Sequence, residues 1–425
     1  MKKFYLSALA GIMTLSSLSA QMKFNFLNQG VGTSLLSINK NGQGLSGGRY
    51  YDFATNKFVF AESTVAALAY NNDKGDYAGA TWIDLDARTT QPAYKKDGVW
   101  YNIPWFPESD PATSQTTVYK NSPNGKYVVG QMSIAESQYG IFVFNTETKE
   151  MKRVIGGDYK HYAAYGVNDN GIVVGWADMP GGGTRRTPIY LDVADMVVHE
   201  IAPAPVLILN SSSAVNSSNI MVGDYNGRGF YFNINTKDFK QVNNPAGSVA
   251  TNFMNLSETN VAVGYADMPD GSRKAIIYHP SMGDTPLYVT DYLTEKGVTI
   301  TATDKSLGTA CSISSDGKYI GGFLNGVSAA FAMGWAAYLD NATLDAASVA
   351  TKAQVSIYPN PVVDKLTIKT NDKISDVEVY NVAGTKTQIL KTQNNELDVR
   401  HLLPGTYIIK FNIGNKAYSE KFIKK

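Results

Sequence analysis

Short apolar runs alternate with polar turns along most of the chain, and one turn pattern recurs seven times. Each copy begins with Asn or Ser and reaches Gly or Asn three residues later; the copies are residues 39–42, 72–75, 122–125, 168–171, 216–219, 257–260 and 314–317. Gly and Asn tolerate the positive φ that a hairpin turn needs, and the leading Asn or Ser can hydrogen-bond the turn backbone. The pattern therefore predicts one β-hairpin per copy.

Each turn is followed by a second strand signal, a short apolar run that ends in Gly. Clear examples are Val173–Gly175 and Ala262–Gly264, whereas the last copy has Tyr319–Gly321 and the first has only the weaker Leu45–Gly47. A small residue at a fixed strand position suggests close backbone approach or a bend. A third apolar stretch and, in several copies, a fourth follow, so each copy is interpreted as four short strands.

Four strands in every repeat predict a β-propeller. The turn Gly moves from residue 42 to residue 317 in six steps of roughly 46 residues, which is the spacing of propeller blades. A single four-stranded sheet cannot bury both faces, and radial packing of several sheets does so while limiting exposed edges. We therefore expect an all-β chain in which residues 21–340 form about seven blades, with six or eight left open by uneven spacing.

The last repeat is too short to supply all four strands of its blade. Residues 323–339 leave room for about two strands, and the strand-like segment 22–27 belongs to no repeat. We expect segment 22–27 to complete the final blade and thereby join the first blade to the last.

Two repeats are near copies of each other, Val174–Gly182 and Val263–Gly271. The repeats resemble the short HAF-type extracellular repeats of bacteria, which start with Ala-x-x-Ile-Asn-x-x-Gly, continue with Val-Gly and end with Ala-Phe-x-Trp. Ala330-Phe331 and Gly334-Trp335 match parts of that ending, but most repeats lack the Trp, so the resemblance is partial.

The end of the chain has a different pattern. Residues 341–354 are rich in Ala and Thr with few large apolar side chains, which indicates a linker. Alternating segments within residues 355–425 predict a short β domain. Its distinctive residues are the opening Tyr358, Pro359, Asn360 and Pro361, the later Pro404, Gly405 and Tyr407, and the terminal Lys424 and Lys425.

Together with a Tyr-Asn-x-x-Gly turn at 380–384, these residues resemble the type A sorting domain of the type IX secretion system of Bacteroidetes. The resemblance implies an immunoglobulin-like sandwich and a folded cargo that crosses the outer membrane. It also implies secretion machinery and a sortase-like protease as partners. Such cargo is released or coupled to surface lipopolysaccharide. The alternative is an ordinary immunoglobulin-like binding domain.

The N-terminus has the pattern of a secretory signal peptide. Lys2 and Lys3 precede an apolar run at residues 5–15, and small residues follow up to Ala20, where we expect cleavage before Gln21. No later stretch reaches the 18 apolar residues or so of a transmembrane helix. We therefore expect a protein that passes through the periplasm and ends at the outer-membrane surface or outside the cell.

Composition narrows the choice of function. The net charge is +1 and 18% of residues are charged, which disfavours a nucleic-acid-binding protein. The single cysteine, Cys311, cannot form an intramolecular disulfide, has no His partner in a recognisable pairing, and is interpreted as a small buried strand residue. No known catalytic, phosphate-binding or zinc-binding motif occurs, so we predict no cofactor and no metal.

Candidate ligand residues come from loops between second and third strands, which share a face with the connections between blades. These loops carry Arg49, Asp178, Arg185, Arg186, Arg228, Asp267, Arg273 and Lys274. One hypothesis is a basic ring formed by Arg185, Arg228 and Arg273, with Asp178 and Asp267, for an acidic glycan or a peptide carboxylate. The alternative is solvated hairpin charge.

Aromatic residues give a second candidate. Trp100 and Trp105 lie beside prolines and suit sugar stacking or protein contact, or else belong to an outer strand and its connection. Three functions therefore remain open. The chain is a surface propeller that binds a glycan or protein, a propeller hydrolase or lyase acting on polysaccharide or peptide, or a structural surface protein.

Overall fold

The computed structural model describes two compact units, Met1–Asn341 and Ala342–Lys425. The described residues are 22–27, 34–135, 138–178, 185–201, 210–300, 307–325, 333–339, 356–369, 374–381, 386–387, 390–391, 395–413 and 416–425. The predicted signal peptide with its expected cleavage between Ala20 and Gln21, and the predicted linker at 341–354, lie outside the described residues. Those boundaries stay predictions.

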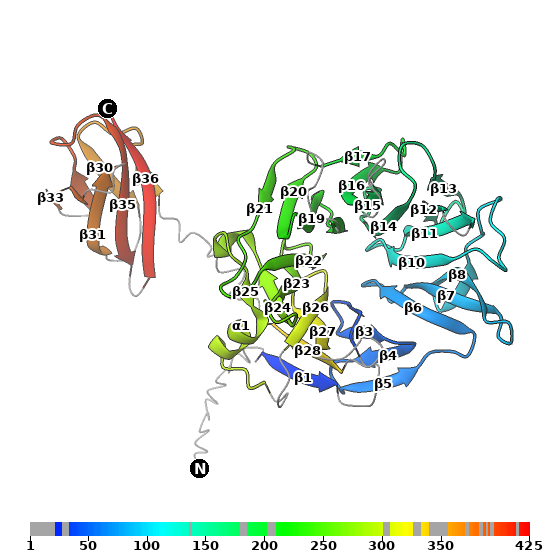
Figure 1. Cartoon of the computed structure of the whole chain (residues 1–425). Helices are drawn as coiled ribbons and strands as arrows, with labels where there is room; N and C mark the ends of the chain where they lie inside the picture. The colour runs from blue at the N-terminus through cyan, green and yellow to red at the C-terminus, as the bar shows by residue number, and fades with distance from the viewer. Residues whose placement is uncertain are drawn as a thin grey trace, which may run out of the picture. The chain divides into compact units, whose positions relative to one another are not determined.

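The described part of the first unit forms seven four-stranded antiparallel sheets arranged as blades around a ring (Figure 1). Blade 1 contains β2 (Ser37–Ile38), β3 (Gln43–Ser46), β4 (Arg49–Asp52) and β5 (Lys57–Phe60). Blade 2 contains β6 (Val65–Asn71), β7 (Tyr77–Asp84), β8 (Thr89–Lys96) and β9 (Val99–Asn102). Blade 3 contains β10 (Thr116–Asn121), β11 (Tyr127–Ala135), β12 (Gln138–Asn145) and β13 (Met151–Val154). The seven-bladed propeller predicted from the repeats is confirmed.

The next three blades continue in chain order, each from its innermost strand outward. Blade 4 contains β14 (Tyr162–Val167), β15 (Ile172–Asp178), β16 (Arg186–Asp192) and β17 (His199–Glu200). Blade 5 contains β18 (Ser211–Val215), β19 (Ile220–Tyr225), β20 (Arg228–Asn233) and β21 (Phe239–Gln241). Blade 6 contains β22 (Ala250–Leu256), β23 (Ala262–Asp267), β24 (Arg273–Tyr278) and β25 (Leu287–Tyr288), with the short helices η1 (Pro280–Met282) and α1 (Val289–Glu295) beside its outer strand.

Blade 7 is shared between the two ends of the propeller. Its inner strands are β26 (Leu307–Ile313), β27 (Tyr319–Leu324) and β28 (Gly334–Tyr338), and its outermost strand is β1 (Lys23–Leu27). β1 pairs antiparallel with β28, from Lys23 opposite Tyr338 to Leu27 opposite Gly334. Figure 1 shows this N-terminal strand in blue beside the last blade. The predicted closure of the ring by segment 22–27 is confirmed.

The repeated Asn or Ser of each turn is buried and binds the turn backbone. In blade 4, Asn168 Oδ1 accepts hydrogen bonds from the Asn170 and Ile172 amides at 3.1 and 2.9 Å. Its Nδ2 donates to the Asn216 carbonyl of blade 5 at 2.8 Å. Asn39 makes the same kind of inter-blade bond to the Asn72 carbonyl at 3.0 Å. The turn residue therefore shapes its own hairpin and, as Asn, also ties one blade to the next.

The repeated glycine lies opposite a β-bulge in the innermost strand. In blade 4 the pairing of β14 with β15 shifts between Ala164 and Gly166, and Gly175 faces Ala164. A Cβ on Gly175 would lie 1.8 Å from the Ala163 carbonyl oxygen, so close approach excludes any side chain. In the last blade the equivalent residue is Gly322 rather than Gly321, because Gly322 is the one whose Cβ would lie 1.8 Å from an inner-strand carbonyl oxygen.

The second unit consists of two four-stranded sheets around a core of its own. One sheet contains β29 (Ser356–Tyr358), β30 (Lys365–Lys369), β34 (Glu396–Asp398) and β33 (Leu390–Lys391). The other contains β32 (Lys386–Thr387), β31 (Ile374–Asn381), β35 (Gly405–Ile413) and β36 (Lys416–Lys424). Leu366, Val379, Leu397, Phe411 and Phe422 belong to the buried cluster of this unit. The fold is the small β-sandwich expected at this end of the chain.

Its characteristic sequence residues hold the sandwich together. Asn360 Oδ1 accepts a hydrogen bond from the Ile423 amide at 2.9 Å, so the opening Tyr-Pro-Asn-Pro segment contacts the last strand. The Tyr407 hydroxyl donates to the Leu403 carbonyl at 2.9 Å, and the Tyr407 ring stacks on Phe422. These contacts explain why the two motifs and the terminal strand occur together.

Candidate functional site

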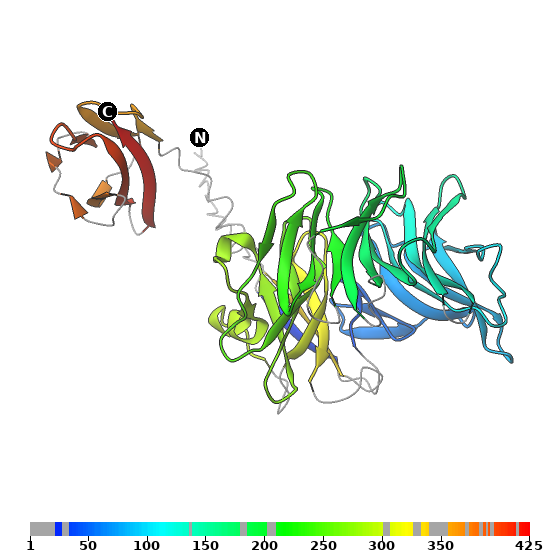
Figure 2. The same ribbon diagram turned by 45° about the horizontal axis from the view of Figure 1, so that its top comes forward.

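The two faces of the propeller carry different loops. The Asn and Ser turns between first and second strands lie on one face, and the loops between second and third strands lie with the blade connections on the other, which we call the upper face. Figure 2, a tilted view, shows strands running from one face to the other. The candidate site opens on the upper face.

A cleft of about 530 Å³ lies where blades 4, 5 and 6 meet the central axis. We call it the upper cleft. Its lining is polar and aromatic and consists of Tyr165, Arg186, Asn210, Ser211, Asp224, Gly227, Ala250, Thr251, Asn252, Tyr265, Asp267 and Arg273. The described residues that line it therefore include two arginines, two carboxylates and two tyrosines.

The two near-identical repeats place the same group of side chains on either side of blade 5. In blade 6, Arg273 Nε lies 3.0 Å from Asp267 Oδ1, and its guanidinium lies 3.9 Å from the Tyr265 ring centroid. In blade 4, the Arg186 guanidinium lies 3.7 Å from the Trp176 ring centroid. In each of these blades, the Asp that ends the second strand pairs with the Arg that begins the third strand. The aromatic rings and carboxylates hold both guanidinium groups in place.

The arginine–carboxylate pair of blade 4, Arg186 with Asp178, is looser than the pair of blade 6. Arg186 Nε lies 3.9 Å from Asp178 Oδ1, and His161 Nε2 lies 3.8 Å from Asp178 Oδ2. Burial raises the pKa of Asp178, although His161 and Arg186 oppose the rise. Burial lowers the pKa of His161, with Asp178 opposing. Both groups are thus shifted toward their uncharged forms, because loss of water outweighs their attraction at this distance.

Asp224 lies between the two arginine groups, on β19 of blade 5. It follows the repeat glycine, as Trp176 and Tyr265 do in blades 4 and 6. Its Oδ1 accepts hydrogen bonds from the Ser211 hydroxyl at 3.0 Å and from Asn252 Nδ2 at 2.9 Å. Burial raises the pKa of this carboxyl to about 7, although both hydrogen bonds oppose the rise. The cleft therefore contains an acid that titrates near neutral pH.

The central channel below the cleft forms a chamber of about 390 Å³. Its walls include the residue three positions before the repeat Asn or Ser in all seven blades: Leu36, Ala69, Tyr119, Tyr165, Ser213, Met254 and Cys311. In blades 2–7 these are the extra residues of the inner-strand bulges. A bulge turns one added side chain out of the ladder, here toward the axis.

The chamber and the upper cleft are neighbours. They share Tyr165, Ser211, Asn252 and Tyr265 as lining residues.

Cys311 lines this chamber, which differs from the buried position expected for it. The residue lies on β26 as predicted, but its side chain is half-buried and its Sγ donates to the Leu35 carbonyl at 3.0 Å. The bulge accounts for the difference, because it directs the side chain to the axis rather than between blades. Burial raises the pKa of the thiol to about 12, so the residue is a poor nucleophile.

The loop residues that the sequence suggested as ligand contacts divide into two groups. Arg273 and Asp267 line the upper cleft, and Asp178 pairs with the cleft residue Arg186. Arg185 and Arg228 are exposed and are not among the residues that line it. Of the three arginines suggested for the basic ring, Arg273 is therefore the one that lines the upper cleft.

The two tryptophans lie elsewhere. Trp100 belongs to β9, the outermost strand of blade 2, and Trp105 lies in the connection to blade 3. Trp105 packs against a buried cluster that contains Phe106 and Phe142. Neither lines the upper cleft or the chamber.

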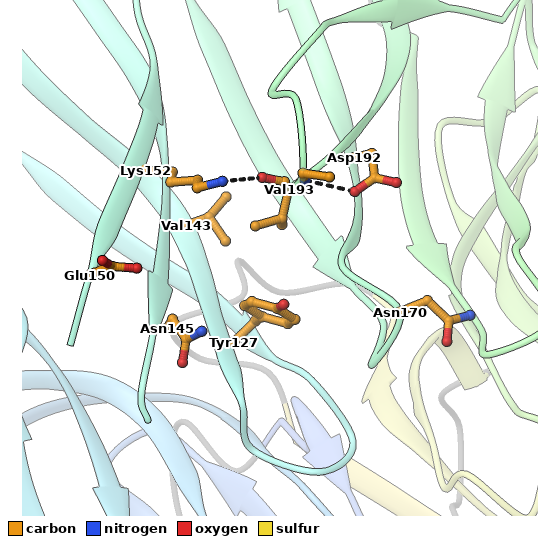
Figure 3. Close-up of a pocket in the computed structure, with 9 residues that line it drawn as sticks. Tyr127, Val143, Asn145, Glu150, Lys152, Asn170, Asp192 and Val193 are labelled. Carbon is orange, nitrogen blue, oxygen red and sulfur yellow. Dashed lines mark hydrogen bonds between the residues drawn. The ribbon is translucent and has the colours of Figure 1, made fainter. Parts of the chain in front are cut away.

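A smaller groove lies on the lower face between blades 3 and 4 (Figure 3). Lys152 Nζ donates to the Val193 carbonyl at 2.7 Å and so connects the two blades across it. Its volume is about 260 Å³, and Tyr127, Asn145 and Asp192 also line it. We interpret this groove as an inter-blade contact, because the lysine that crosses it already has a backbone acceptor.

Sequence reasoning missed Asp224, Asn252, Tyr165 and Tyr265 of the cleft and Lys120 of the chamber as site residues. Two signals could have found three of them. Asp224 and Tyr265 directly follow the repeat glycine, and Tyr165 stands three residues before a repeat Asn. Asn252 and Lys120 carry neither signal.

Among the described residues, no group of three or more His, Cys, Asp and Glu side chains is gathered as metal ligands would be. None of the helices in the described part of the chain has the length and apolar character needed to cross a membrane.

Several solved structures are similar to this chain. TolB from Acinetobacter baumannii has 13% identity and a TM-score of 0.38, with 59% of this chain and 61% of that chain covered. The extracellular domain of the hybrid two component system BT4673 from B. thetaiotaomicron has 9% identity and a TM-score of 0.45, with 95% and 59% covered. The chain thus spans about three fifths of the length of these proteins. Likenesses at this level say nothing about activity.

A family comparison is more specific for the end of the chain. No curated protein sequence matches the chain. Residues 356–425, however, match the family described as "Secretion system C-terminal sorting domain". This match covers the β-sandwich and its Tyr-Pro-Asn-Pro opening. The second unit is therefore a type IX secretion sorting domain, and the protein is exported to the cell surface or beyond it.

Proposed function

We propose that the exported propeller is a surface binding protein that takes a glycan in its upper cleft. The observation that carries this proposal is the cleft lining, in which Arg186, Asp224, Asn252 and Arg273 accompany two tyrosines. Carboxylates, amides and guanidinium groups hydrogen-bond sugar hydroxyls, and aromatic rings pack against the apolar faces of sugar rings. The arginines are already held by their aromatic and acidic neighbours, so little side-chain entropy is lost on binding.

We also propose the steps of export and processing that the sequence suggests. Residues 1–20 act as a signal peptide, the secretion machinery recognises the sorting domain, and a sortase-like protease removes that domain. The mature protein is then released or coupled to lipopolysaccharide. Mass spectrometry of the exported protein tests this, because loss of residues 1–20 and of the sorting domain changes both terminal peptides.

Thermal unfolding of the purified chain against neutral and acidic oligosaccharides tests the binding proposal. A ligand that binds only the folded state stabilises it by roughly 2.7 kcal/mol at 100 times its dissociation constant. We expect stabilisation by one glycan class, and Arg186→Gln or Arg273→Gln should weaken binding about tenfold. Lys274→Gln is a matched control, because it removes a charge beside Arg273 from a residue outside the cleft lining. No shift with any glycan, or equal binding by all variants, would contradict the proposal.

The same assay tests the two exposed arginines of the original basic-ring hypothesis. Arg185→Gln and Arg228→Gln should bind the glycan like the parent if the cleft alone makes the site. A loss of affinity in either variant would extend the site to the hairpin loops.

One observation favours a second candidate, a propeller hydrolase or lyase. The raised pKa of Asp224 is suited to a general acid or base near neutral pH. Product analysis after incubation with the bound glycan distinguishes the two functions. Cleavage that is lost in Asp224→Asn would establish an enzyme, and an intact glycan would leave the binding function.

A further inference from the structure

The chamber below the upper cleft contains a buried amine. Lys120 lies on β10 of blade 3, and only 9% of its surface is exposed. Its Nζ donates to Asn255 Oδ1 on β22 of blade 6 at 2.9 Å and lies 4.6 Å from the Tyr70 ring centroid of blade 2. Residues of blades 2, 3 and 6 thus converge on this amine.

This amine has no ion-pair partner among the described residues. Within the described ranges, its contacts are one amide oxygen and one aromatic face. A lysine ammonium has three N–H donors, so two donors have no acceptor in the described part of the chain. Burial lowers the pKa of Lys120 to about 8, although the carboxylate of Glu258 opposes the change. Buried ammonium groups are otherwise almost always paired, because an isolated charge in a poorly hydrated site is costly.

The space around the amine suits a small ligand. The chamber has a volume of about 390 Å³, within the range of small-molecule sites, and shares lining residues with the upper cleft. Tyr70, Tyr119 and Tyr165 contribute aromatic walls. A sugar ring in the chamber would find flat apolar surfaces beside the amine.

The charge balance selects the kind of anion. Lys120 contacts the neutral Asn255 amide and the Tyr70 ring, and the carboxylate of Glu258 acts on it only from beyond ion-pair distance. One ammonium in this setting matches a single negative charge. A doubly charged phosphate would leave one charge uncompensated in a buried site. A carboxylate offers two oxygens that can accept the two free N–H donors, and charge-assisted hydrogen bonds of this kind are strong.

We propose that Lys120 binds the carboxylate of an acidic sugar in the central chamber. The sugar part of this inference rests on the proposed glycan-binding function. The upper cleft then contacts the rest of the glycan, and the chamber selects for an acidic sugar at the end of that glycan.

Calorimetric titration of the full chain with glucuronate and with glucose at pH 7 tests the inference. The two sugars differ by the carboxylate, so glucuronate should bind at least tenfold more tightly than glucose. Lys120→Met should remove this preference. Asn255→Asp is a second variant, because it supplies a carboxylate partner to Lys120 without removing the amine, and it should also abolish glucuronate binding. Lys152→Met removes an amine from the groove on the opposite face and should change nothing.

Three results would overturn the inference: no glucuronate binding by the parent chain, equal binding of both sugars, or unchanged glucuronate binding in both chamber variants. Failure of the proposed function gives a different result, in which no oligosaccharide binds and the Arg186 and Arg273 variants behave like the parent. Oligosaccharide binding without glucuronate preference would preserve the proposed function and reject the acidic-sugar site.

Discussion

At the scale of single residues, buried polar side chains organise both the fold and the site. Asn168 is fully buried, and its amide group makes bonds within its own turn and to the next blade. Asp224 is nearly as buried but holds a titratable group. Loss of Asn168 therefore removes hydrogen bonds, whereas Asp224 makes the stability of the fold depend on pH.

Replacement of Asn168 by alanine should destabilise the propeller by about 2–4 kcal/mol, because buried backbone donors and an inter-blade acceptor lose their partners. Chemical denaturation measures the change. Asn170→Ala is the matched control, because Asn170 belongs to the same turn but makes its inter-blade bonds at the exposed surface. That variant should lose less than about 1 kcal/mol. Equal losses would show that burial of the turn amide is unimportant.

Asp224 should make stability fall as pH rises. Its pKa is raised from an ordinary 3.8 to about 7, so between these values the folded state holds a proton that the unfolded state has released. The stabilising contribution is complete below about pH 4 and is lost as pH rises through 7, with a slope of roughly 1.4 kcal/mol per pH unit between pH 5 and 7. Denaturation of Asp224→Asn should lack this slope, whereas Asp86→Asn, at an exposed carboxylate, should retain it. Parallel curves for Asp224→Asn and the parent would refute the assignment.

At the scale of elements, a bulge and a glycine act together in the inner hairpins of blades 2 to 7. The bulge pushes a carbonyl into the space that a Cβ would occupy on the second strand, and it turns an added residue toward the channel. In blade 1 this second-strand position is Ser46, so a side chain is accepted there. The bulge that requires glycine at position 175 in blade 4 therefore also places Tyr165 in the chamber.

Gly175→Ala should therefore destabilise the protein by about 3 kcal/mol or more, since the new Cβ would meet the Ala163 carbonyl oxygen. Ser46→Ala is the control, because that position already carries a Cβ, and it should cost less. Thermal unfolding of both variants measures the difference. A parent-like midpoint for Gly175→Ala would mean that the bulge can relax.

At the scale of the whole propeller, stability depends on closure by the N-terminal strand. β1 supplies the outer edge of blade 7, with Leu27 buried and Phe24 stacked on Trp335. Without it, β28 would become an exposed edge and the ring would lose its link between first and last blades.

Deletion of residues 22–27 should lower stability by about 3 kcal/mol or more, and the whole propeller should still unfold in one transition. Circular dichroism melting measures this, and a synthetic peptide of residues 22–27 added in trans should restore part of the loss. Lys23→Ala, which changes an exposed side chain of the same strand, should melt within a few degrees of the parent. A deletion whose melting curve overlays the parent would exclude a closing role.

Much of the architecture was predictable because it depends on local and repeated patterns. Turn chemistry at Asn168 and its equivalents indicated the blade number, and the unmatched strand at 22–27 indicated closure. The Tyr358–Pro361 opening and the Pro404–Tyr407 segment identified the sorting domain, because these sequence motifs occur in the order that is typical of such domains. Such signals need only short-range hydrogen bonding and alternation.

The site was predictable only in part. Arg273 and Asp267 were suggested by their hairpin. The basic ring suggested from sequence combined Arg273 with Arg185 and Arg228, whereas the upper cleft is lined by Arg273 together with Arg186 and Asp224. Side chains of adjacent residues point to opposite faces of a sheet. A difference of one position therefore decides that Arg186 lines the cleft and its neighbour Arg185 does not.

The sequence by itself determined a closed, repeated β architecture and an export signal at the end of the chain. Tertiary structure alone decided which side chains meet at the axis. Lys120 and Asn255 are joined across the ring only because radial packing brings blades 3 and 6 together and inner-strand bulges turn neighbouring residues inward. Distances across the axis depend on how the blades tilt and pack around the ring, which the local spacing of the residues involved does not encode.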